Sequence, residues 1–127
     1  MQGLLLVATG GAIGSVARYL LSAFTLRNFG SGWPYGTLSA NVLGGLLIGA
    51  LAGLLAFRGG AGQDKIRLLL QVGFLGGFTT FSAYSLEVAL MIERRDLAQA
   101  AVYALTSVVL SVGALFLGLA LARKAFA

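Results

Sequence analysis

The chain has 127 residues, of which 58% are hydrophobic and 10% are charged, whereas soluble domains devote about a quarter of their residues to charge. This composition excludes a soluble globular domain and indicates an integral membrane protein in contact with the lipid bilayer. The net charge of +5 is the balance of nine basic and four acidic residues, and most of the basic residues are scattered at segment ends. That distribution argues against a nucleic-acid partner and favours anchors at lipid headgroups. Histidine and cysteine are absent, which argues against a zinc or other soft-metal site.

The first apolar segment is expected at residues 4–26, a length that crosses a hydrocarbon core of about 30 Å. It carries Gly10 and Gly14, a small-residue pair that lets another helix approach closely. Arg18 follows one turn later, inside the apolar register. Two interpretations of Arg18 are open: it anchors the helix at the interface, or it lines an aqueous vestibule that attracts anions.

The second segment is expected at residues 37–57. A ridge of glycines on one helix face predicts close packing against another helix, and it consists of Gly45, Gly49 and Gly53. Asn41 lies one turn into the helix, at membrane depth. Its amide either hydrogen-bonds a neighbouring helix or serves a polar pathway.

The third segment, residues 66–91, would be about 40 Å long if wholly helical, which exceeds one bilayer core. Residues 73–85 read GFLGGFTTFSAYS, so that three glycines, two threonines and two serines interrupt the apolar run. Irregular backbone at membrane depth is tolerated only where it is buried in protein or lines a wet cavity. We therefore expect a break in the middle of this segment and a functional site at the break.

Aromatic and polar side chains follow the expected break at helical spacing. Phe81 and Tyr84 share one helix face, with Ser82 beside them, although such aromatic pairs are also common in plain packing. The fourth segment, residues 97–121, repeats a polar side chain every four positions, at Tyr103, Ser107 and Ser111. This stripe either bonds backbone carbonyls one turn away or lines a water-accessible path.

Four spans make a single membrane domain over residues 1–127 and place both termini on one side of the membrane. That side collects five basic residues and the other side three or four, a weak asymmetry that permits insertion in both orientations. Four helices are too few to enclose a polar pathway, so the glycine-rich faces suggest a homo-oligomer, most simply a two-fold dimer. If both orientations coexist, that dimer can be antiparallel.

Three motifs make the chain resemble the Fluc (CrcB-type) fluoride channels. They are the run at residues 73–85, PYGTLSAN at residues 34–41 and GGAIGSVAR at residues 10–18. The likeness covers all four segments in order. It implies a passive, fluoride-selective channel in the cell inner (plasma) membrane, built as an antiparallel dual-topology homodimer with two pores. Such a channel exports cytoplasmic fluoride and reduces its toxicity.

The resemblance also implies roles for individual residues. Asn41 matches the pore asparagine, and Phe81 and Tyr84 match an aromatic box whose ring edges face the ion. The backbone carbonyls of Gly76 and Thr79 match those that hold a structural Na⁺ at the dimer interface. The other fluoride-pore residues that it implies are Arg18, Ser82, Tyr103, Ser107 and Ser111.

One position departs from the family pattern, because Tyr84 stands where phenylalanine is common. The ring keeps its electropositive edge, while the hydroxyl adds a donor and occupies space at one edge. A small anion in a narrow dry pore loses its water, and that cost is offset only when several donors converge on it. Amides, hydroxyls and aromatic edges are the donors that this sequence offers.

Two other functions are compatible with this composition. A proton-coupled small multidrug exporter would share the size and weak charge asymmetry, but it needs an acid within a span, and Glu87 is the single candidate. Glu87 is also open to a structural interpretation, as a residue near the helix end that bonds the backbone or Arg18. A non-transporting assembly subunit is opposed by the cost of keeping many polar groups at membrane depth. An enzyme is disfavoured because histidine, cysteine and any pair of in-span carboxylates are absent.

Overall fold

The computed structural model describes residues 1–58 and 63–126, and the regular structure within them is entirely helical. The elements in chain order are α1 (Gln2–Phe29), α2 (Tyr35–Arg58), α3 (Gln63–Ile66), η1 (Arg67–Leu75), α4 (Gly76–Phe78), α5 (Phe81–Glu93) and α6 (Leu97–Phe126). They form four spans, each long and apolar enough to cross a membrane, with α3 to α5 together making the third. The predicted all-α fold with four helices able to span a membrane is thereby confirmed.

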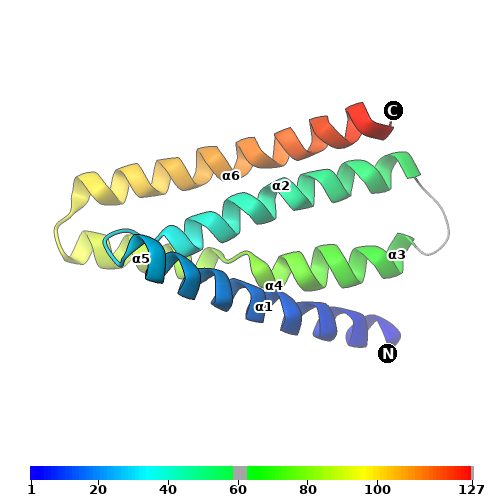
Figure 1. The fold of residues 1–127 in the computed structure, drawn as a ribbon, viewed down its shortest axis with the longest axis horizontal. Helices are drawn as coiled ribbons and strands as arrows, with labels where there is room; N and C mark the ends of the chain where they lie inside the picture. Colours follow the sequence, from blue (N-terminus) through cyan, green and yellow to red (C-terminus); the bar gives the residue numbers. More distant parts are fainter. Residues whose placement is uncertain (59–62, 127) are drawn as a thin grey trace.

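The four spans run side by side and alternate in direction, as Figure 1 shows. The N- and C-terminal ends of the chain lie at one end of the bundle, and the connectors at residues 30–34 and 94–96 lie at the other. α6 lies along α2, while α1 packs across η1 and α4. The middle of the third span therefore lies between α1 on one side and the pair of α2 and α6 on the other.

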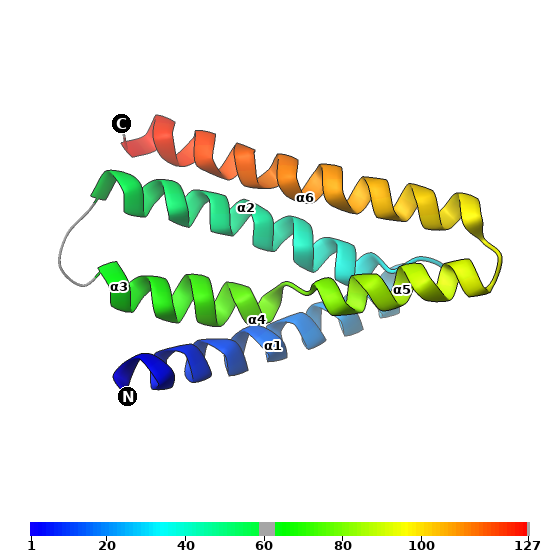
Figure 2. The ribbon, with the colours of Figure 1, turned by 180° about the vertical axis from the view of Figure 1, so that it is seen from behind.

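The third span changes its backbone conformation along its length (Figure 2). The π-helical η1 leads into the single turn of α4, and then Thr79 (φ −90°, ψ 156°) and Thr80 (φ −153°, ψ 124°) are extended. The helix resumes at Phe81, where the Thr80 hydroxyl accepts a hydrogen bond from the Ala83 N–H and caps α5. The last carbonyls of α4 and the first N–H groups of α5 are therefore released at the middle of the span.

Glycines on α2 allow α6 to pack against it at backbone distance. A Cβ atom on Gly45 would lie 2.6 Å from the Ser111 carbonyl oxygen, and one on Gly53 would lie 2.7 Å from the Ala122 side chain. A Cβ atom on Gly49 would collide with the Leu115 carbonyl. The close helix packing predicted from this ridge is confirmed, and α6 is the helix that approaches it.

The small residues of α1 make a second contact of the same kind. A Cβ atom on Gly14 would collide with the Phe74 carbonyl oxygen, and one on Gly77 would lie 2.6 Å from the Gly11 carbonyl oxygen. α1 therefore touches both η1 and α4 through backbone atoms. This contact holds the end of α4 in place just before the extended residues.

An aromatic cluster closes the connector end of the bundle. The ring of Trp33 meets that of Tyr103 edge-on, with centroids 5.3 Å apart, and its indole N–H donates to the Gln99 side-chain oxygen at 3.0 Å. Tyr103 is fully buried in this cluster beside Met91 and other apolar side chains. The connector after α1 is thereby fixed to α6.

Candidate functional site

A groove of about 340 Å³ lies where α2, α5 and α6 meet the extended residues of the third span. Its walls are mostly apolar, with aliphatic and aromatic side chains beside several hydroxyl and amide groups, and it opens to the outside of the chain. Six of the ten candidate site residues taken from the sequence line it: Asn41, Thr79, Phe81, Tyr84, Ser107 and Ser111. Residues from three separate spans thus converge on one mostly apolar hollow.

Asn41 uses both ends of its amide to bind the backbone of Thr80. Its Nδ2 donates to the Thr80 carbonyl oxygen at 3.0 Å, and its Oδ1 accepts from the Thr80 N–H at 2.8 Å. The Asn41 amide thus binds the extended backbone of Thr80 through one donated and one accepted bond, as the backbone of a neighbouring β-strand would. They occupy one of the two amide N–H groups, so the second remains a candidate donor toward the groove.

Two aromatic rings stand at the start of α5. The centroids of Phe81 and Tyr84 are 5.4 Å apart with their planes tilted by 46°. The Tyr84 hydroxyl donates to the Ala104 carbonyl oxygen of α6 at 3.2 Å, whereas Phe81 is 76% exposed at the groove edge. The Tyr84 hydroxyl therefore ties α5 to α6.

Ser107 and Ser111 place hydroxyl groups in the groove wall formed by α6. Both hydroxyl oxygens are buried, and neither has a hydrogen-bond partner among the described residues. A buried hydroxyl without a partner costs free energy. These two groups are therefore available to a ligand that enters the groove.

The other polar candidates lie around the groove rather than in its lining. Tyr103 continues the α6 line one turn before Ser107, and its hydroxyl donates to the Glu87 carboxylate at 3.3 Å. The exposed Ser82 hydroxyl lies 3.1 Å from that of Thr80. Arg18 is separate from the groove, and its Nε–H donates to the Gly77 carbonyl oxygen at 3.2 Å.

The carbonyl groups at the end of α4 differ in how they are satisfied. The Leu75 oxygen accepts both the backbone N–H and the hydroxyl of Thr79, each at 3.0 Å, and the Gly77 oxygen accepts Arg18. In the described parts of the chain, the carbonyl oxygens of Gly76 and Thr79 accept no hydrogen bond. Both are therefore free to bind something else.

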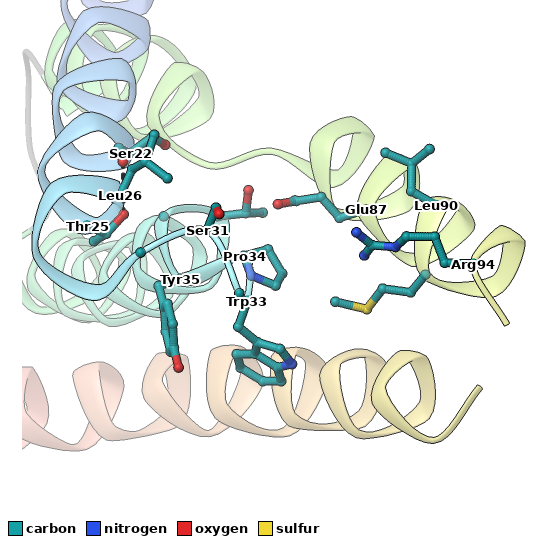
Figure 3. Close-up of a pocket in the computed structure, with 15 residues that line it drawn as sticks. Ser22, Thr25, Leu26, Ser31, Trp33, Pro34, Tyr35, Glu87, Leu90 and Arg94 are labelled. Atoms are coloured by element: carbon teal, nitrogen blue, oxygen red, sulfur yellow. Dashed lines mark hydrogen bonds between the residues drawn. The ribbon is translucent and has the colours of Figure 1, made fainter. Parts of the chain in front are cut away.

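A second pocket, of about 350 Å³, lies at the connector end between α1 and α5 (Figure 3). Glu87 of α5 and Arg94, the residue that follows α5, line one side, and Ser22 and Thr25 of α1 line the other. Glu87 thus belongs to this pocket and is not part of the groove lining. The sequence left Glu87 either as a coupling acid or as a residue near the helix end that bonds the backbone or Arg18, and no local pattern indicated that it would meet Tyr103.

The fold and the groove define a class of protein: a four-span membrane protein with polar donors gathered at the middle of its spans. Residues 5–119 match the family model described as CrcB-like protein, Camphor Resistance (CrcB). The chain belongs to this family.

Several curated relatives match over the whole chain. A protein of Phenylobacterium zucineum (strain HLK1) is 69% identical over 127 residues, which cover 100% of both chains. A protein of Caulobacter sp. (strain K31) is 63% identical over 126 residues, which cover 99% of this chain and 98% of its own. One of Caulobacter vibrioides (strain NA1000 / CB15N) is 57% identical over 100% of both. Each of the three is named fluoride-specific ion channel FluC.

Proposed function

We propose that the protein is a passive, fluoride-selective ion channel of the cell inner (plasma) membrane that exports cytoplasmic fluoride and so lowers its toxicity. The observation that carries this proposal is the groove. It holds two buried serine hydroxyls without partners beside an asparagine amide and two aromatic rings, within an apolar wall. The names of the relatives, which are those of a channel rather than an enzyme, point to the same function.

The chemistry of the groove suits a small anion. Hydroxyl and amide hydrogens and the edges of aromatic rings all present positive charge, and each is weak alone. Ser107 and Ser111 supply hydroxyls, Asn41 supplies its second N–H, and Phe81 and Tyr84 supply ring edges. Ser82 and Tyr103 adjoin these donors: the Ser82 hydroxyl lies 3.1 Å from that of the lining residue Thr80, and Tyr103 precedes Ser107 by one turn of α6. Together these donors offset the free-energy cost of the water that fluoride loses on entry.

The groove carries no acidic side chain, which supports uncoupled permeation over proton-coupled export. Glu87, the acid that a coupled exporter would need, faces the connector-end pocket instead. Its carboxylate accepts a hydrogen bond from Tyr103. A structural role in fixing α5 against α6 accounts for these contacts.

A second copy of the chain completes the pathway in this proposal. One chain leaves the groove open on one side and leaves Phe81 76% exposed. Each chain forms a single four-span domain with one such groove. An antiparallel homodimer would cover both grooves at once and so give two pores. The weak charge asymmetry between the two ends of the chain supports insertion in both orientations.

The dimer interface is also the proposed place for a structural Na⁺. The carbonyl oxygens of Gly76 and Thr79, which accept no hydrogen bond within the described residues, are ligands suited to a hard cation. The described residues contain no group of three carboxylate, histidine or cysteine side chains that could hold a metal instead. A bound Na⁺ would supply fixed positive charge near the anion path and satisfy the carbonyls that the extended residues release.

Replacement of Phe81 tests the pore. In Phe81→Ile the ring edge is lost while an apolar side chain remains, so we expect fluoride efflux from proteoliposomes to be abolished. Light scattering should still give the mass of two chains. Phe24→Ile is the matched control, because Phe24 is an exposed ring of α1 outside the groove. Wild-type efflux in Phe81→Ile would contradict the proposed pore.

A further inference from the structure

Arg18 of α1 reaches the third span just before its extended residues. Its Nε–H donates to the Gly77 carbonyl oxygen at 3.2 Å, and its side chain is half-buried and outside the groove. We infer that Arg18 is a positioning residue that acts through this donor, and not through its charge, by fixing the end of α4 from which Thr79 and Thr80 depart. Its link to ion flux rests on the proposed function.

The packing of α1 against α4 brings Arg18 to this carbonyl. Gly11 and Gly77 touch through backbone atoms, since a Cβ on Gly77 would lie 2.6 Å from the Gly11 oxygen. A Cβ on Gly14 would lie 3.0 Å from the Phe78 nitrogen. Arg18 lies one turn beyond Gly14 on the same face of α1. The glycine contact therefore sets the separation that the arginine side chain spans.

The Gly77 carbonyl needs a donor from outside its own helix. It belongs to the last turn before the helix ends at Phe78, where carbonyls lose their intrahelical partners. At membrane depth no bulk water replaces them. Successive residues of a helix are rotated by about 100° around its axis, while their carbonyls all point toward its C-terminal end. A bond that fixes the Gly77 carbonyl therefore also fixes the position of the free Gly76 carbonyl, one residue earlier in the same turn.

A positive charge offers a rival explanation for the same arginine. It would interact favourably with the carbonyl end of a helix, and it would attract anions to a vestibule. Two substitutions separate these effects. Arg18→Gln places an N–H on the atom bonded to Cδ, the position of arginine Nε, but removes the charge, whereas Arg18→Lys keeps the charge and puts a methylene there.

Carbonyl resonances in bilayers report the contact without any measurement of flux. With glycine labelled at the ¹³C carbonyl and phenylalanine at ¹⁵N, the sequence contains two labelled pairs, Gly73–Phe74 and Gly77–Phe78. We expect the Gly77 carbonyl resonance to shift in Arg18→Lys and to stay in place in Arg18→Gln, with Gly73 as the internal control in both. An unchanged Gly77 resonance in Arg18→Lys would overturn the inference.

Fluoride efflux from proteoliposomes then tests whether the contact matters for permeation. We expect Arg18→Gln to conduct like wild type and Arg18→Lys to lose flux by up to about tenfold, as for loss of one hydrogen bond. Efflux that stays at the wild-type rate in Arg18→Lys, or that is lost in both variants, would contradict a role carried by the Nε donor. If the wild type itself passed no fluoride, the proposed function would fail while the resonance test would still decide the contact.

Discussion

At the scale of single residues, the sequence predicted which polar side chains would line the site, but it did not predict their hydrogen-bond partners. Asn41 and Ser107 stood out as polar groups within apolar segments, and both line the groove. The pairing of Asn41 with Thr80 joins residues 39 positions apart, and no local pattern encodes it. The Tyr84 hydroxyl likewise could not be assigned in advance, because its acceptor is a backbone carbonyl of another helix.

The bond from Tyr84 to Ala104 predicts a measurable contribution to stability. Tyr84→Phe keeps the ring and removes the donor, so the free energy of unfolding should fall by about 0.6 kcal/mol, the average for polar contacts between membrane helices. Tyr19→Phe is the matched control, because Tyr19 is 72% exposed and its hydroxyl makes no hydrogen bond within the described residues. Reversible unfolding in detergent measures both variants. Equal stability of the two would show that the Tyr84 hydroxyl contributes nothing to the α5–α6 contact.

At the scale of elements, the helices and their glycine faces follow from apolar length and small-residue spacing. That is why α1, α2 and α6 and the ridge of Gly45, Gly49 and Gly53 could be predicted. The π-helical bonding of η1 could not, since residues 67–75 carry no local signal that separates it from α-helix. Which helix the ridge would meet was equally open, because small-residue spacing identifies a packing face and not its partner.

A pair of glycines tests the α2–α6 contact. Gly49→Ala would push its new methyl group into the Leu115 carbonyl, and overpacking of this kind costs about 1–3 kcal/mol. Gly113→Ala of α6 meets nothing within 4 Å, so it should be neutral or stabilising through its better helix propensity. Thermal unfolding midpoints of the two variants provide the comparison. Matching midpoints would mean that the helices do not approach as closely as the structure describes.

At the scale of the whole molecule, composition and hydropathy were sufficient to predict four membrane spans. The assembly of the groove was not available from them, because it depends on three spans meeting at the extended residues of the third. A single chain leaves that groove open and its serine hydroxyls without partners among the described residues. In the antiparallel dimer that we propose, a second copy would close this groove and complete the path.

The most direct test of this account is ion efflux from liposomes that contain the purified wild-type protein, with fluoride and chloride compared at matched gradients and no proton gradient. We predict rapid fluoride efflux and no chloride efflux, because the groove offers several weak donors that suit a small dehydrated anion and no acid for proton coupling. Absence of fluoride efflux, equal passage of chloride, or fluoride efflux only against an opposing proton gradient would contradict it.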